Sequence, residues 1–287
     1  MTLTFNDDDL EYCARLVRDG DPDRFATAML APMPARAYLV SLYAFNLEVS
    51  KLRETVREAM LGEIRLQWWR DAVAECVAGT PRRHQVVHPL AVTLAATGLP
   101  QDLLLQAIDI RSADLDELPP ANEAALKAYV DASGGSIGEM AVHCVSAKEP
   151  TAQGLAAGRA AGRAWAWIGL ARGLHPHRRM GRRTVPASVL KAAPNLDSAI
   201  ERAEMGEPVR DWVARLVEYA RDELGTVAAT RHPRHLRPAL AQARLAAVYA
   251  SRLERNDFNP FSPKINAMGQ ARRAVALAGV TMFGRLS

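Results

Sequence analysis

Apolar residues recur along most of the chain every three or four positions, the spacing of one face of an α-helix. In the proline-free stretch near the N-terminus, Leu39 and Tyr43 follow this spacing in a first segment. Leu66 and Trp69 continue it in a second segment, with Gly62 before them. The pattern predicts two helices in this stretch, separated at Gly62.

Proline and glycine divide the rest of the chain into further segments of helical length. These are residues 89–110, 121–148, 151–174, 209–230 and 238–255. The alternation typical of strands is nearly absent, and Ala, Leu and Arg, which favour helices, dominate. The irregular region 175–208 contains four prolines, and we interpret it as a long connection inside one helical domain. The pattern predicts an all-α protein.

The composition supports a folded protein with a large core. The chain has 287 residues, of which 49% are hydrophobic and 24% charged, and these values argue against disorder. The net charge of +4 is compatible with phosphates, anionic lipid or nucleic acid as partners. Because no nucleic-acid motif accompanies it, we interpret the charge as a solvated arginine-rich surface and expect no nucleic-acid partner.

The cysteines and the apolar stretches help to predict the cellular compartment of the protein. Cys13, Cys76 and Cys144 are odd in number and form no CxxC pair, which argues against a disulfide framework or a zinc site. The first ten residues lack the apolar core of a secretory signal. Residues 272–286 could lie on a membrane surface, but we favour packing on the core. We expect a cytoplasmic protein, with peripheral contact at the inner face of a membrane as a further option.

Several segments resemble, in the same order, those of the squalene/phytoene synthase family. The resemblance covers about nine-tenths of the chain, and its specificity comes from the order of the pieces rather than from any single one. The segments are LYAF at 42–45, RLQWWRDAV at 65–73, IDIRSADL at 108–115, YVDASGGSIGEM at 129–140, AGRAWAWIGLARGLHPHRRMGRRTVP at 161–186 and LERNDFNPFSPK at 253–264.

The resemblance implies a fold and a chemistry. The fold is a single large helical domain of the isoprenoid synthase type over residues 1–287, with a central cavity. Residues 1–20 would form an N-terminal segment and 265–287 a C-terminal helix or tail. Family members join two isoprenoid diphosphates head to head with magnesium, a hard cation that binds carboxylate and phosphate oxygens. Two aspartate pairs at i, i+4 spacing place the carboxylates of each pair on one helix face.

The first aspartate motif is almost absent. In the family, R-x-x-D-D-x-x-D follows the YAF sequence. Here the arginine falls on Leu47, the adjacent aspartates on Ser50 and Lys51, and the last aspartate on Glu54. A lysine ammonium has donors only and repels a divalent cation. We predict no metal site at these positions.

The second motif, Q-x-x-N-x-x-R-D-x-x-x-D in the family, keeps only its arginine. Its positions fall on Ala166, Gly169, Arg172, Gly173 and His177. The proline before the histidine cannot continue a regular helix, so we expect the helix to end near residue 174. The histidine would then lie off the face that the missing aspartate occupies in the family.

Other residues match positions that line the family's pocket. They could line a lipid-shaped cavity, or they could be buried polar groups and close-packing glycines of a helix bundle. The candidate ligand-binding residues are Tyr43, Asp114, Tyr129, Gly135, Gly138 and Arg172.

A basic stretch at 175–183 is a candidate anion patch. Its arginines could bind a diphosphate, a lipid headgroup or an acidic partner, and the alternative is a solvated basic loop. The candidate residues are Arg178, Arg179, Arg182 and Arg183.

Together the motifs resemble a degenerate branch of the family that includes a mitochondrial complex I assembly factor. We expect a non-catalytic assembly or scaffolding protein that uses no cofactor and binds a partner protein or an isoprenoid-like lipid. A second hypothesis is an active prenyltransferase that uses magnesium with relocated ligands such as Asp114, Asp131 or Glu139. A third is a basic helical adaptor whose pocket has collapsed.

Overall fold

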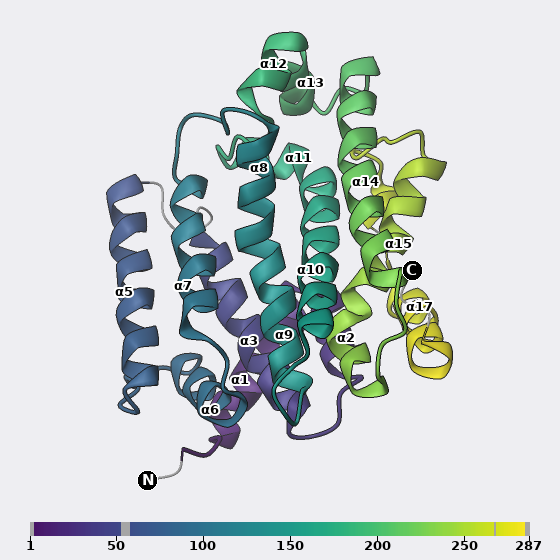
Figure 1. The fold of residues 1–287 in the computed structure, drawn as a ribbon. Coiled ribbons are helices and arrows are strands. Elements are labelled where there is room, and N and C mark those ends of the chain that lie inside the picture. Colours follow the sequence, from purple (N-terminus) through teal and green to yellow (C-terminus); the bar gives the residue numbers. More distant parts are fainter. Residues whose placement is uncertain (1–2, 53–57, 267, 285–287) are drawn as a thin grey trace.

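The structure, a computed structural model, describes residues 3–52, 58–266 and 268–284. Every regular element in these ranges is helical, and the long helices stand side by side in one bundle (Figure 1). The prediction of an all-α fold is therefore confirmed.

The first half of the chain forms the left and central parts of the bundle in Figure 1. Its helices are α1 (Asp7–Gly20), α2 (Pro22–Ala28), α3 (Ala35–Ser50), α5 (Ala59–Val77), α6 (Val87–Thr97), α7 (Gln101–Asp109), the 3₁₀-helix η1 (Ile110–Asp114), α8 (Glu123–Val130), the π-helical segment η2 (Asp131–Gly135) and α9 (Ser136–Val145).

The second half adds the central α10, the short helices at the top and the right side of the bundle in Figure 1. Its helices are α10 (Ala152–Arg172), α11 (Leu174–Arg179), α12 (Ala187–Ala192), α13 (Leu196–Arg202), α14 (Glu207–Ala228), the 3₁₀-helix η3 (Arg234–Leu236), α15 (Arg237–Arg255), α16 (Pro263–Asn266) and α17 (Gln270–Phe283). The connection predicted at 175–208 thus contains three short helices.

Two of the predicted helix boundaries are wrong. Gly62 lies inside α5 and is buried there, and a Cβ atom on it would come within 2.5 Å of the Leu115 side chain. It allows close packing rather than ending a helix. The single helix predicted at 89–110 is two helices. Gly98 ends α6 in the left-handed conformation (φ 63°), and Pro100 precedes α7.

Helix α10 and the continuous η2–α9 segment are in direct backbone contact. A Cβ atom on Gly134 would lie 2.7 Å from the carbonyl oxygen of Gly162, and one on Gly158 would lie 2.6 Å from that of Gly138. Each helix presents two glycines four residues apart, which places them on one face. Because all four lack side chains, the two backbones touch directly, as expected for glycines that permit close helix approach.

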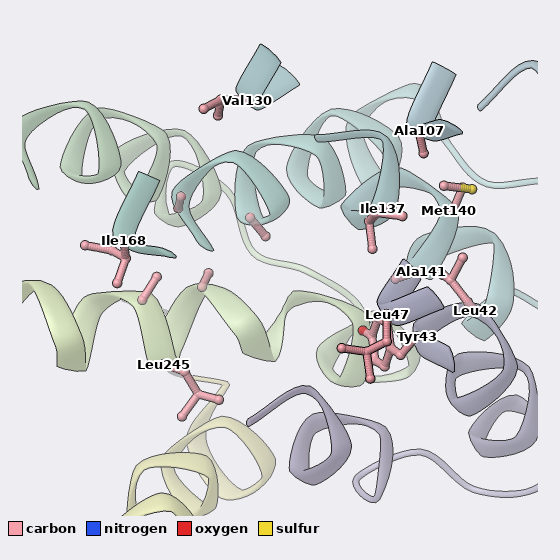
Figure 2. Packing of buried hydrophobic residues seen from close by; sticks show 14 of the residues in the cluster. Leu42, Tyr43, Leu47, Ala107, Val130, Ile137, Met140, Ala141, Ile168 and Leu245 are labelled. Carbon is pink, nitrogen blue, oxygen red and sulfur yellow. The ribbon is translucent and has the colours of Figure 1, made fainter. Parts of the chain in front are cut away.

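The interior of the bundle is apolar. Side chains from α3, α7, α8, α9, α10 and α15 point into it (Figure 2). Tyr43, Ile137, Ile168 and Leu245 have no exposed surface, and Leu47 is 7% exposed. An open cavity in this interior, which the resemblance implies, stays a prediction.

The helix at the C-terminal end packs on the core. Helix α17 contacts α15 and α2, and its Leu277 and Val280 are buried. Arg273 of α17 donates a hydrogen bond to Asp23 of α2 at 2.5 Å. Packing of this segment is confirmed for the described residues. Within those residues, no helix has both the length and the hydropathy needed to cross a bilayer.

We expect Gly138→Ala to lower the free energy of unfolding by about 2–3 kcal/mol or more, because the new methyl group would overlap the Gly158 backbone. Gly169→Ala is the matched control. A Cβ there meets no atom within 4 Å, so alanine should stabilise α10 by up to about 1 kcal/mol. Urea unfolding of both variants measures the difference. Equal stability of the two would contradict the glycine crossing.

Candidate functional site

The positions of the first motif lie at the end of α3. Leu47 is buried, and the Ser50 hydroxyl donates a hydrogen bond to its carbonyl oxygen at 3.2 Å. Lys51 follows the last residue of α3, and its side chain lies against Gly20 at the end of α1. A Cβ atom added to Gly20 would be 3.0 Å from the Lys51 Nζ. Glu54 lies outside the described residues. The described part of this motif therefore supplies a hydroxyl group and a cation, and no carboxylate.

The positions of the second motif lie at the end of α10. The helix ends at Arg172 with Gly173 as its cap, in agreement with the predicted end near 174. Gly169 is exposed. After the cap the chain starts the short helix α11, which carries His177. Arg172 is thus the one charged group that this motif brings to the end of α10.

Arg172 is held by residues from distant parts of the chain. Its guanidinium lies over the Tyr249 ring, 3.6 Å from the centroid, and its Nε donates to Asn266 at 2.8 Å. Asp23 accepts a hydrogen bond from the Tyr249 hydroxyl at 2.7 Å and lies 4.0 Å from an Arg172 nitrogen. With Arg273 these residues form what we name the Asp23 cluster. Burial raises the pKa of Tyr249 to about 12.

The Asp23 cluster is an ion-pair network with little exposed surface. Two guanidinium groups surround one carboxylate whose side chain is 8% exposed. In such surroundings the carboxylate is stabilised by its partners, because an unpaired buried charge is costly. The positive charge of Arg172 is thus partly neutralised by the protein itself.

A second buried network joins η1, α8 and the 180–186 loop. The Tyr129 hydroxyl donates to Asp114 at 2.9 Å and accepts from Arg111 at 3.0 Å and from Arg182 at 2.8 Å. Arg182 also lies 2.8 Å from Asp114, and the Asp114 side chain is 4% exposed. We name these four residues the Asp114 cluster. Burial raises the pKa of Tyr129.

His177 lies beside the Asp114 cluster. Burial, and after it the positive charge of Arg182, lower the pKa of its imidazole to about 3. A neutral imidazole can be a metal ligand, but the nearby guanidinium groups would oppose a cation here.

Part of the predicted anion patch is already occupied by carboxylates. Arg182 belongs to the Asp114 cluster, and Arg178 bonds Asp197 at 2.9 Å and Glu201 at 3.3 Å. Arg179 and Arg183 are exposed. Two of the four arginines are therefore engaged by carboxylates of the protein, and an anion patch at the exposed two stays a prediction. The sequence could not show these ion pairs because the carboxylates come from other helices.

The carboxylates considered as relocated magnesium ligands are engaged elsewhere. Arg159 donates to both Asp131 and Glu139 at 2.6 Å. Arg163 bridges Asp131 and Glu223 at 3.0 and 2.7 Å. The hydrogen bond from Arg159 lowers the pKa of Asp131. These acids form a network between η2, α9, α10 and α14.

A magnesium clamp does not fit the residues present. Outside the undescribed positions, no three His, Cys, Asp or Glu side chains lie close enough together to hold a metal ion. The described motif positions carry Ser50, Lys51, Gly173 and His177.

Two of the other predicted ligand-binding residues are glycines that allow close packing. Gly138 forms the crossing with α10, and a Cβ atom on Gly135 would come within 2.9 Å of the Asp131 carboxylate. Tyr43 lies in the apolar interior shown in Figure 2, and burial raises the pKa of its hydroxyl to about 12.

Sequence reasoning missed several residues that complete the two clusters. Arg111 could have been found, because it lies three positions before Asp114 inside the IDIRSADL segment. Asp23, Tyr249 and Arg273 carried no such signal, since the tyrosine and the arginine are more than 220 positions from Asp23.

The sequence has relatives among characterised families. A family model described as squalene/phytoene synthase matches residues 17–277. The NADH dehydrogenase (ubiquinone) complex I, assembly factor 6, of Rattus norvegicus is 24% identical over 256 residues, which is 88% of this chain and 76% of that protein. The protein of the same description from Mus musculus is 23% identical over the same length.

Solved structures share the arrangement of helices. A dehydrosqualene synthase with bound ligand superposes with a TM-score of 0.82 at 15% identity, covering 95% of each chain. The squalene synthase HpnC from Alicyclobacillus acidocaldarius gives a TM-score of 0.71 at 19% identity, covering 88% of this chain and 95% of that one. At such low identity the likeness demonstrates the fold.

We expect Asp114→Asn to lower the free energy of unfolding by about 3–5 kcal/mol, because two buried guanidinium groups lose their carboxylate. Asp257→Asn is the control, since its pair with Arg210 is exposed and should contribute nothing measurable. Urea unfolding at neutral pH compares the two. A loss at Asp114 no larger than that at Asp257 would show that the cluster does not stabilise the fold.

The low pKa of His177 makes stability depend on pH. The unfolded chain binds a proton at this residue below about 6.5, and the folded chain does so only below about 3. The folded state therefore loses stability as pH falls through this window, by about 2–3 kcal/mol between pH 7 and 4.5. Urea unfolding at both pH values should show a smaller loss for His177→Gln than for the wild type and for the exposed-residue control His235→Gln. The same loss in all three proteins would contradict this.

Proposed function

The chain belongs to the squalene/phytoene synthase family, and we propose that it is a non-catalytic member that works as an assembly or scaffolding protein by binding a partner protein. The observation that carries this proposal is the replacement of both aspartate motifs. At the described motif positions the side chains include a lysine and a histidine but no carboxylate.

The electrostatics of the site support this proposal. Two magnesium-bound diphosphates need several carboxylates facing one space. Here Asp23 and Asp114 are enclosed by arginines, and Asp131 and Glu139 are bonded to Arg159. Each of these acids is occupied by a positive group of the protein, which also opposes the approach of a divalent cation. This argues against the alternative of an active prenyltransferase with relocated ligands.

The partner class follows from the named relatives. The similar proteins from rat and mouse are described as assembly factors of complex I. We propose by analogy that the partner is a subunit of an assembling respiratory complex. For its place in the cell we propose the cytoplasm, with peripheral contact at the inner face of the membrane.

Binding of an isoprenoid-like lipid is a second candidate. It is supported by the apolar interior of the bundle and by Arg172 and Tyr249 at its polar end. Such binding would depend on apolar contacts and would not need magnesium.

We expect the purified protein to release no diphosphate from farnesyl or geranylgeranyl diphosphate with magnesium present, because the ligands that would hold the metal are missing. A phosphate-detection assay after pyrophosphatase treatment measures release, with an active squalene synthase as positive control. Thermal unfolding with each diphosphate, with and without magnesium, measures binding. Magnesium-dependent release would refute the non-catalytic proposal. A thermal shift that is indifferent to magnesium would support the lipid-binding candidate.

A further inference from the structure

A surface groove is lined by residues of α12, α13 and α14. These helices meet at the top end of the bundle in Figure 1, where α12 and α13 lie beside the upper end of α14. It has a volume of about 620 Å³, within the range of ligand-binding clefts. Its walls come from α12, the Ala193–Leu196 segment, the first turns of α14 and the start of α8. It is separate from the Asp23 and Asp114 clusters, because it shares no residue with them.

The floor of the groove is apolar. Its apolar lining residues are Val189, Ala192, Ala193, Pro194, Leu196, Pro208 and Trp212. None of the side chains of α12 is fully buried. The Trp212 side chain is buried, and the described part of the chain supplies no acceptor to its indole nitrogen. The apolar face of α12 is therefore not fully covered by the rest of the protein. The buried indole N–H of Trp212 has no hydrogen-bond acceptor among the described residues.

The groove is held in shape by the surrounding structure. The backbone N–H groups of Ala187 and Ser188 donate to the carbonyl oxygens of Pro120 and Ala121, at 2.8 and 3.2 Å. Below them, Leu196 of α13 has no exposed surface. A preformed groove binds a partner with less loss of conformational entropy than a mobile one.

The rim of the groove is acidic, although the whole protein is basic. Three carboxylates, Glu123, Glu207 and Asp211, and one guanidinium, Arg215, line it, which gives a local net charge of −2 against +4 for the chain. Arg215 bonds Glu123 at 2.8 Å, and the Tyr219 hydroxyl bonds the same carboxylate.

Two of these acids make no ion pair within 4 Å in the described part of the chain. Glu207 and Asp211 are exposed on the first turns of α14. The neighbouring Arg210 is engaged by Asp257 at 2.6 Å. The negative charge at the rim is thus available to an incoming group.

We propose that this groove binds a basic amphipathic segment of the partner protein, with apolar side chains on the Trp212 floor and lysine or arginine at Glu207 and Asp211. This deepens the proposed function, on which it rests, by naming the chemistry of the partner. Charge complementarity selects the occupant, because an anionic lipid or an acidic peptide would be repelled by the rim. The binding mode is that of an amphipathic helix in an apolar groove.

The test is fluorescence anisotropy with a labelled 14-residue peptide that has leucine and lysine at helical spacing. We expect wild-type protein to bind it, and binding to weaken as NaCl rises. The double variant Glu207→Lys with Asp211→Lys should raise the Kd about tenfold or more, because attraction becomes repulsion. A peptide with glutamate in place of lysine should not bind.

Two further variants separate the groove from general charge effects. Asp222→Lys makes the charge change of one substitution of the double variant on the same helix, about 16 Å along α14 from Asp211, and should change the Kd less than about twofold. Ala192→Trp leaves the charge unchanged and fills the groove from an exposed position, and should weaken binding about fivefold or more. Circular dichroism of each variant confirms folding.

Equal Kd values for wild type, the double charge variant and Ala192→Trp would overturn the groove proposal. Equal binding of the lysine and glutamate peptides would overturn it as well. Neither experiment contains magnesium or a prenyl diphosphate. If the peptide experiment contradicts the groove proposal, the non-catalytic proposal is unaffected. Magnesium-dependent diphosphate release would contradict the non-catalytic proposal without changing the peptide result.

Discussion

The direct backbone contact between η2–α9 and α10 is the constraint on which the rest of the structure depends. Helix α10 also packs against α14 and α15, so its position sets that of the right half of the bundle. Four glycines, Gly134, Gly138, Gly158 and Gly162, allow this contact, and a side chain on any of them would meet the opposite helix within 3 Å. Helices that cross this closely leave little room for adjustment, because protein interiors are packed at crystal-like density.

The glycine crossing explains how the fold can persist while its motif residues change. The crossing is a backbone contact of glycines, and none of these glycines is a position of the two aspartate motifs. Substitutions at Lys51, Gly173 or His177 do not touch the crossing glycines Gly134, Gly138, Gly158 and Gly162. The scaffold is therefore maintained by packing that is independent of the metal-binding chemistry of the wider family.

Arginine has taken a stabilising role where metal chemistry would need free carboxylates. Asp23 is enclosed by Arg172 and Arg273, and Asp114 by Arg111 and Arg182. A guanidinium group satisfies several oxygen atoms at once and stays charged at any physiological pH. These networks join α2 to α17 and η1 to the 180–186 loop. They link segments far apart in sequence and neutralise the acids of the interior.

The sequence by itself determined the helical class and most helix positions, because hydrophobic periodicity is a local property. It also determined the end of α10 near residue 174, where Gly173 caps the helix and Pro176 falls in the separate short helix α11. Only the tertiary structure decided that Gly62 packs against Leu115 instead of breaking α5, and that Arg182 faces Asp114 instead of an external anion. The partners of Asp23, and the acidic groove at Glu207 and Asp211, depend equally on how distant helices meet. The sequence specifies the charge and shape of each residue. The group that a residue contacts depends on packing between segments that are far apart in the sequence, and no local pattern predicts that packing.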